Sequence, residues 1–128
     1  MAETPGRKII VIVEDTQEIA QLMKDTLNAE LEFQAVVAAD SALAMEVIRS
    51  IKADLIIMDV YLPGMSGIEL YDLLQDDPDI KAVPVLFVTA AHSDPNFKRR
   101  KFKHYMAKPF DLDELVGLVQ KICSTDEK

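Results

Sequence analysis

Short apolar runs alternate with amphipathic segments along the whole chain. Five runs are short and apolar enough to be strands buried in a sheet. They span Lys8–Val13, Phe33–Ala38, Asp54–Asp59, Val83–Val88 and His104–Ala107. After the first, second, third and fifth runs, apolar residues recur at a spacing of three and four, which predicts a helix. After the fourth run, a short basic helix is expected to begin near Pro95. These helices are expected from Gln17 to about Ala29, from Asp40 or Ser41 to about Ser50, from Ser66 to Asp76, over Asp94–Lys103, and after Asp111.

The regular alternation of strand and helix predicts one parallel sheet covered by helices on both faces. Parallel strands need long connections, and right-handed crossovers place the helices on the two faces. We therefore expect an α/β fold of the flavodoxin-like type, a three-layer (βα)5 sandwich with strand order 2-1-3-4-5. The 128 residues suffice for one domain with its own core. The predicted division is a lead-in over residues 1–7, a domain over 8–123 and a tail over 124–128.

Charge and cysteine content narrow the possible functions. The net charge of −8 disfavours direct binding of nucleic acid by the whole domain. The single cysteine, Cys123, excludes an intramolecular disulfide and suits a reducing compartment. The apolar run Ile9–Val13 is too short for a signal segment or a membrane span. We therefore expect a soluble, cytoplasmic protein that has no membrane association.

Polar and charged residues that could take part in a reaction stand at the carboxyl ends of four predicted strands. Glu14 and Asp15 follow the first strand, Asp59 ends the third, Thr89 follows the fourth, and Lys108 follows the fifth. With strand order 2-1-3-4-5, these ends lie side by side. Three carboxylates so close together repel one another unless a cation joins them, and oxygen ligands beside open water suit Mg²⁺. The ammonium and the hydroxyl could then neutralise a phosphoryl group that the aspartate attacks.

Four motifs at these strand ends resemble those of a known family. They are Val13-Glu14-Asp15, Met58-Asp59 with Leu62-Pro63-Gly64-Met65-Ser66-Gly67, Val88-Thr89-Ala90, and Lys108-Pro109-Phe110. With these motifs the sequence resembles a receiver domain of two-component response regulators, of the kind found in chemotaxis regulators. The resemblance implies a domain that accepts a phosphoryl group from the phosphohistidine of a sensor histidine kinase or a phosphotransfer protein. Such a domain catalyses only its own phosphorylation and dephosphorylation, so it is not an enzyme for an external substrate.

The resemblance also implies a phosphoacceptor and a metal site. Asp59 would accept the phosphoryl group. Glu14, Asp15, Asp59 and the backbone carbonyl of Tyr61 would hold Mg²⁺ or Mn²⁺. The side chain of Tyr61 would lie beside the path of the attacking water, where some relatives carry an amide or carboxylate. We therefore predict that the phosphorylated form loses its phosphoryl group slowly.

The remaining implied roles concern the switch. Lys108 would pair with the phosphoryl group, and Thr89 would donate its hydroxyl to it and shift towards it. Tyr105 would be the aromatic switch that turns inward as Thr89 moves. The interval from Thr89 to Lys108 is shorter than in the family by roughly one helical turn, so the fourth helix is expected to be short or irregular.

Five positive side chains lie within six residues in this shortened region. They are Lys98, Arg99, Arg100, Lys101 and Lys103. The simplest interpretation is a solvated helix face. A sharper hypothesis is a surface for an acidic protein partner, including a second copy of this acidic domain.

Three other functions compete with the phospho-accepting one. A phosphatase of the haloacid-dehalogenase type would carry a second aspartate two residues after the nucleophile, where this chain has Tyr61. A flavodoxin-like nucleotide or flavin binder would need a phosphate-binding loop after the first strand, where Glu14-Asp15-Thr16 would repel phosphate. A receiver-like scaffold that is never phosphorylated is disfavoured because all the named site residues are present. The sequence fits both a single-domain regulator and a receiver from a longer protein.

Overall fold

The computed structural model describes residues 6–124. Its strands are β1 (Lys8–Val13), β2 (Phe33–Ala38), β3 (Leu55–Met58), β4 (Val85–Thr89) and β5 (Tyr105–Ala107). They form one parallel sheet of order β2-β1-β3-β4-β5, which confirms the predicted fold class and strand order. The predicted lead-in and tail fall largely on residues 1–5 and 125–128, which lie outside the described residues.

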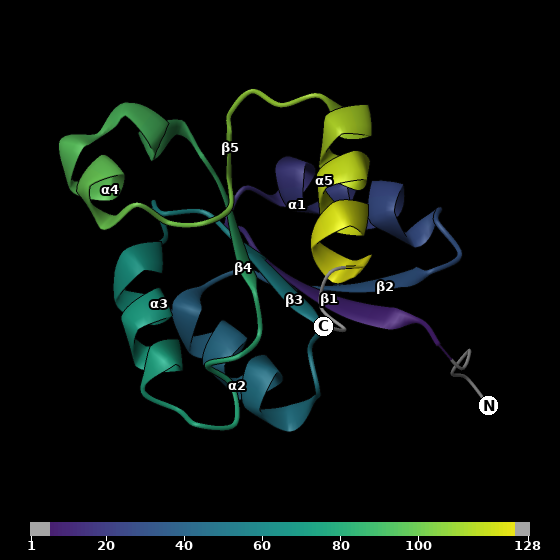
Figure 1. Cartoon of the computed structure of the whole chain (residues 1–128), viewed down its shortest axis with the longest axis horizontal. Coiled ribbons are helices and arrows are strands. Elements are labelled where there is room, and N and C mark those ends of the chain that lie inside the picture. The colour runs from purple at the N-terminus through teal and green to yellow at the C-terminus, as the bar shows by residue number, and fades with distance from the viewer. Residues whose placement is uncertain (1–5, 125–128) are drawn as a thin grey trace.

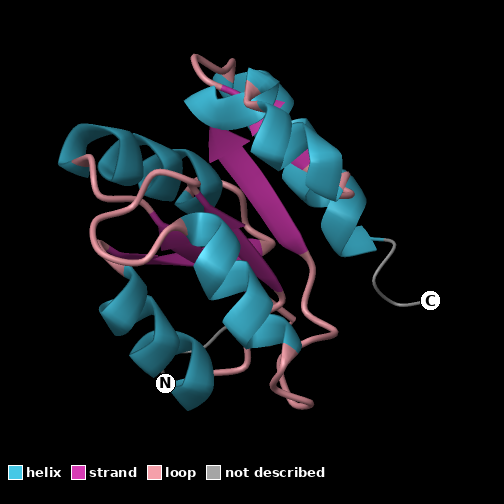
Figure 2. Cartoon of the chain, turned by 90° about the vertical axis from the view of Figure 1, so that its left-hand side faces the viewer, coloured by secondary structure: helices cyan, strands magenta, loops and turns pink. Residues whose placement is uncertain are grey.

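Helices cover both faces of the sheet. They are α1 (Gln17–Asn28), α2 (Ser41–Ser50), α3 (Gly67–Gln75), α4 (Pro95–Arg100) and α5 (Leu112–Ser124), with a short 3-10 helix η1 (Ala90–Ser93) before α4. Figure 1 shows α1 and α5 on one side of the sheet and α2 and α3 on the other. Figure 2 shows the sheet from a second direction, enclosed between these helical layers. The arrangement is the expected three-layer sandwich.

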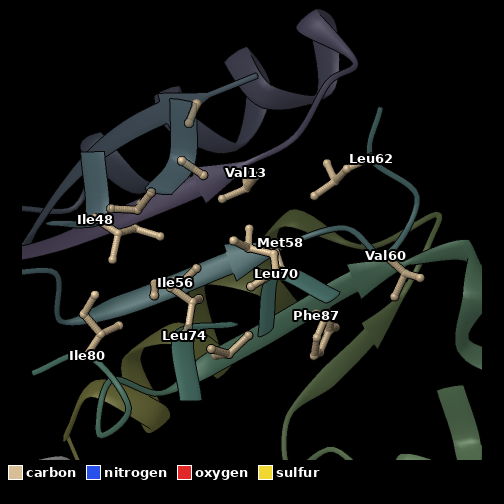
Figure 3. Packing of buried hydrophobic residues seen from close by; sticks show 14 of the residues in the cluster. Val13, Ile48, Ile56, Met58, Val60, Leu62, Leu70, Leu74, Ile80 and Phe87 are labelled. Atoms are coloured by element: carbon tan, nitrogen blue, oxygen red, sulfur yellow. The ribbon is translucent and has the colours of Figure 1, made fainter. Parts of the chain in front are cut away.

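Strand β3 shows why the central runs are apolar without a break. Its side chains alternate between two separate hydrophobic clusters, one on each face of the sheet. Ile56 and Met58 point towards Leu70 and Leu74 of α3 (Figure 3). Leu55 and Ile57, the alternating residues, pack in the cluster that includes side chains of α1 and α5. All four residues of β3 are therefore buried, which holds the end of the strand, and the aspartate that follows it, in a fixed place.

Three strands differ in their bounds from the prediction; the fifth begins at Tyr105 instead of His104. The third strand was expected over Asp54–Asp59 and spans Leu55–Met58, because the loop begins directly at Asp59. The fourth was expected over Val83–Val88 and spans Val85–Thr89. Pro84 has no amide hydrogen for the sheet, although its carbonyl oxygen accepts a hydrogen bond from the Ile56 amide at 3.0 Å.

The fourth helix is short, as expected. Its six residues begin at Pro95, and the Asp94 carboxylate caps them by accepting from the Asn96 amide at 2.8 Å. The helix ends at Arg100, and the cap residue Lys101 has a left-handed backbone with φ of 53°. This turn directs Phe102 back towards the core, where its ring centroid lies 4.5 Å from that of Phe87. The helix is therefore shorter than the predicted Asp94–Lys103.

Candidate functional site

The carboxyl ends of the strands gather most of the predicted site residues. Glu14 follows β1, Asp59 follows β3, Thr89 ends β4 and Lys108 follows β5. Backbone hydrogen bonds hold this edge together: the Asp59 amide donates to the Val13 carbonyl at 3.3 Å, and the Lys108 amide donates to the Thr89 carbonyl at 3.1 Å. Three of these side chains, those of Glu14, Asp59 and Lys108, touch one another.

Two buried carboxylates share one ammonium group. Lys108 Nζ donates to Glu14 Oε1 at 2.9 Å and to Asp59 Oδ2 at 2.7 Å. The side chains of Glu14 and Asp59 are only 1% and 7% exposed. Their other oxygens accept backbone amides, Glu14 Oε2 from Thr16 at 3.1 Å and Asp59 Oδ1 from Tyr61 at 3.1 Å. Each oxygen of the two carboxylates therefore accepts a hydrogen bond. Because one ammonium faces two carboxylates, the cluster of Glu14, Asp59 and Lys108 keeps an excess of negative charge.

The two carboxylates hold Lys108 in its charged form. Burial by itself lowers the pKa of Lys108, but the hydrogen bonds to Asp59 and Glu14, with the charges of both, outweigh this effect and raise the pKa. A cation stabilised in this way contributes to folding stability below its ordinary pKa of 10.5, and the contribution is lost as the pH rises through the raised value. At neutral pH the ammonium is therefore a permanent part of the site.

The donor set suits a hard divalent cation. Glu14, Asp15 and Asp59 supply only oxygen atoms, and Lys108 neutralises one of their three charges. Asp15 is exposed and lines a shallow hollow with Tyr61. Within residues 6–124, no three acidic, histidine or cysteine side chains already surround one ion position. Two of the predicted ligands instead point their oxygens at Lys108.

Within residues 6–124, neither of the two predicted switch residues, Thr89 and Tyr105, forms a side-chain hydrogen bond with Glu14 or Asp59. Thr89 is fully buried, and its hydroxyl oxygen accepts from the Ala91 amide at 3.0 Å. Among the described residues, no hydrogen bond joins Thr89 to Asp59. Tyr105 is 54% exposed, and its ring meets that of Phe97 edge-on at 5.7 Å. The structure therefore has Tyr105 facing outward, and its inward turn stays a prediction.

Comparison with known proteins identifies the family. The model of the response regulator receiver domain family matches residues 10–120. The chain belongs to this family. Its fold resembles that of the response regulator TrrA of Thermotoga maritima, solved in complex with Mg²⁺-BeF. That structure has a TM-score of 0.76 and 28% identity, with 90% of this chain and 98% of the other chain covered.

Two relatives show different contexts for such a receiver domain. The hybrid signal transduction histidine kinase D of Dictyostelium discoideum is 32% identical over 118 residues, which are 89% of this chain but 7% of that protein. The polar-differentiation response regulator DivK of Brucella anthropi is 27% identical over 116 residues, which are 88% of this chain and 94% of DivK. The chain thus spans a small part of one relative and nearly all of the other.

Membership places the receiver domain in two-component signalling. Receiver domains of this family interact with histidine kinases or phosphotransfer proteins. The family assignment argues against the phosphatase and flavin-binding alternatives. None of the helices within residues 6–124 has the length and apolar character needed to cross a membrane.

Arg100, one of the five basic residues of the predicted partner surface, forms an ion pair within the domain. The Arg100 guanidinium donates to both carboxylate oxygens of Asp72 on α3, at 2.7 and 3.3 Å. Its central carbon also lies 5.1 Å above the centroid of the Phe102 ring. Arg100 therefore ties the end of α4 to α3, which is a structural role.

The other four of these five basic side chains are exposed and form no ion pair with any residue from 6 to 124. Arg99 donates to the side chain of Asn96 at 3.0 and 3.1 Å. The other three are Lys98, Lys101 and Lys103. Four of the five predicted basic side chains are therefore without an ion pair in the part of the chain that the structure describes, and their role in binding a partner stays a prediction.

Two residues that support the loop after Asp59 were not identified as site residues from the sequence. The sequence marks Ser41 only as a possible first residue of the second helix. In the structure Asp40 caps α2, and the hydroxyl of the buried Ser41 donates to the Met65 carbonyl at 2.8 Å. Gly67 lies so close to the backbone of Asp59 that a Cβ atom would overlap the Asp59 carbonyl oxygen. The motif containing Gly67 was a usable signal, whereas the partner of Ser41 lies 24 residues away and no local pattern indicates it.

Proposed function

We propose that this receiver domain accepts a phosphoryl group on Asp59 from the phosphohistidine of a sensor histidine kinase or phosphotransfer protein. The observation that carries the proposal is the buried Asp59 carboxylate, held 2.7 Å from Lys108 Nζ at the end of β3. A fixed carboxylate is positioned for attack on phosphorus, and a nearby ammonium neutralises the charge on the phosphoryl oxygens. The added charge would then change a protein-interaction surface. We assign this role to residues 8–123, acting in the cytoplasm.

Mg²⁺ is the proposed cofactor. Asp59, Glu14 and Asp15, with the backbone carbonyl of Tyr61, would hold the ion. The support is the excess negative charge around Lys108, the all-oxygen donor set, and the Mg²⁺-BeF complex of the Thermotoga relative. When bound, the ion supplies further neutralisation of charge on the phosphoryl oxygens.

Labelling at Asp59 tests the proposed function directly. With Mg²⁺ and acetyl phosphate, the wild-type protein is expected to gain one acid-stable, base-labile phosphoryl group, and Asp59→Asn is expected to gain none. Asp113→Asn serves as a matched control, because Asp113 is an exposed carboxylate in the first turn of α5. Intact-mass spectrometry measures the gain. Equal labelling of Asp59→Asn would contradict the proposal, and no labelling of the wild type would favour the receiver-like scaffold.

Tyr61 is expected to slow the loss of the phosphoryl group. Tyr61 is 57% exposed, and its backbone amide donates a hydrogen bond to the Asp59 carboxylate. A ring at this position can screen the acyl phosphate, and it offers no amide or carboxylate to orient the attacking water. Tyr61→Asn should therefore lose phosphate several-fold faster than the wild type, as measured by mass spectrometry after removal of acetyl phosphate. Tyr61→Phe is the control and should match the wild type; an unchanged rate in Tyr61→Asn would refute this role.

We propose that four basic residues near α4, which have no ion pair within residues 6–124, bind an acidic protein, here a second copy of the chain. They are Lys98, Arg99, Lys101 and Lys103. They oppose the net charge of −8, so association between copies should weaken as salt rises. Sedimentation at low salt is expected to show dimers in the wild type and in Lys52→Glu, and monomers in the double variant Lys98→Glu/Arg99→Glu. A wild-type protein that is monomeric at low salt would rule out self-association through this surface.

A further inference from the structure

A second hollow lies at the opposite edge of the sheet from Asp59. It has a volume of about 230 Å³ and sits beside the first residue of β4, between the end of α3 and the turn before β5. Its lining residues include two aromatic ones, Tyr71 and Phe102, and three basic ones, Lys81, Lys103 and His104. We call it the distal pocket.

The aromatic wall of the distal pocket is fixed by the core. The Tyr71 and Phe102 rings meet edge-to-face with centroids 5.0 Å apart, and each also packs against the buried Phe87, at 5.9 and 4.5 Å. The central carbon of the Arg100 guanidinium lies 5.1 Å from the centroid of the Phe102 ring, and the guanidinium is hydrogen-bonded to Asp72. The two rings are therefore set at a steep angle to each other and are held in place by their packing against Phe87.

The charge around the distal pocket is positive and unbalanced. No carboxylate side chain lines it, and neither Lys81 nor Lys103 forms an ion pair with any residue in the described range 6–124. Burial lowers the pKa of His104, and the charges of Lys103 and of Lys121 on α5 lower it further. In a chain with a net charge of −8, this concentration of positive charge is a local inversion.

We propose that the distal pocket binds a compact anion in which a phosphate, phosphonate or carboxylate group is attached to a flat apolar body. The volume of about 230 Å³ is below the roughly 300 Å³ at which pockets for drug-sized ligands begin, so the ligand must be small. Lys81 and Lys103 supply charge-assisted hydrogen bonds to the anionic group. Tyr71 and Phe102, which both line the pocket, supply apolar contacts for the body of the ligand. The pocket shares no lining residue with the Asp59 site, and the proposal does not depend on phosphorylation.

Phenylphosphonate is a suitable probe, because its carbon–phosphorus bond prevents it from donating a phosphoryl group to Asp59. The chain contains two histidines, His92 and His104, and their imidazole signals in NMR spectra can be followed together without Mg²⁺. His92 lies outside the distal pocket and is the internal control. Titration should shift the His104 signal saturably and raise its pKa by about half a unit or more, since a nearby anion favours the protonated imidazole.

Matched variants separate binding in the distal pocket from general attraction of anions. Lys81→Ala/Lys103→Ala should weaken binding by about tenfold, because hydrogen bonds to charged groups are strong. Lys98→Ala removes an exposed lysine that does not line the pocket and should leave the affinity unchanged. Because Lys81 and Lys103 are both exposed in the wild type, the double variant should keep the melting temperature of the wild type. The proposal fails if His104 shows no saturable shift, if His92 shifts equally, or if the double variant binds as tightly as Lys98→Ala.

Discussion

Replacing Lys108 with methionine is expected to lower the free energy of unfolding by about 3 kcal/mol. Lys108 is the shared cation of two carboxylates that are 1% and 7% exposed, at 2.9 and 2.7 Å. Removing one partner of a buried ion pair leaves uncompensated charge in a medium of low polarity. Methionine keeps most of the apolar stem, so the loss comes mainly from the ammonium. Urea unfolding at pH 7 measures it, provided that the denaturant slope is unchanged.

Two further variants show whether electrostatics cause this loss. Adding Asp59→Asn to Lys108→Met should restore part of the stability, because one of the two facing negative charges is removed; the gain over the sum of the single changes is the coupling energy. Lys121→Met, an exposed lysine on α5, should change stability by no more than about 0.5 kcal/mol. If Lys108→Met were as stable as Lys121→Met, the buried ion pairs would not contribute to folding.

Gly67→Ala is expected to destabilise the receiver domain by about 3 kcal/mol and to slow labelling of Asp59. The added methyl group would overlap the Asp59 carbonyl oxygen and lie 3.0 Å from Val60 Cα. These are backbone atoms, which cannot rotate away as a flexible side chain can. The Gly67 amide also donates to the Val60 carbonyl at 2.8 Å, so the same turn would have to open. Thermal unfolding and the acetyl phosphate reaction measure the two effects.

Gly117 provides a matched control for this substitution. It lies within α5, and a Cβ atom there would have no heavy atom within 4 Å. Gly117→Ala should therefore stabilise the protein by roughly 0.5–1 kcal/mol, because alanine favours the helix and restricts the unfolded chain. Similar stabilities for the two alanine variants would show that the loop after Asp59 adapts to the methyl group without strain.

The order of the elements could be predicted because it depends on local patterns. Each central strand is buried on both faces, so its residues are continuously apolar, and each helix has one apolar face. Right-handed crossovers then restrict how five parallel strands can be arranged. Since the carboxyl ends of parallel strands meet at one edge, the spacing of Glu14, Asp59, Thr89 and Lys108 was enough to bring them to that edge. The short α4 also followed from a count of residues between Thr89 and Lys108.

The contacts within the site depend on residues far apart in the chain. Lys108 pairs with Glu14 and Asp59, which are 94 and 49 residues away, and which oxygens it meets depends on the register of three strands. The sequence motifs indicated a metal site, whereas the folded chain turns two of the proposed ligands towards this lysine. Side-chain partners across a sheet are set by backbone register and loop path, which periodicity does not encode.

The distal pocket likewise depends on contacts between segments that are far apart in the sequence. The sequence shows that Lys81, Phe102, Lys103 and His104 exist, but Lys81 precedes β4 and the other three precede β5. They come together because β4 and β5 are paired in parallel and begin at the same edge, and because the left-handed turn at Lys101 directs Phe102 inward. Local periodicity thus accounts for the strands, the helices and the edge on which Asp59 lies. Pairing between distant segments accounts for what each polar side chain contacts there, since those contacts form only when the strands are in register and the core is packed.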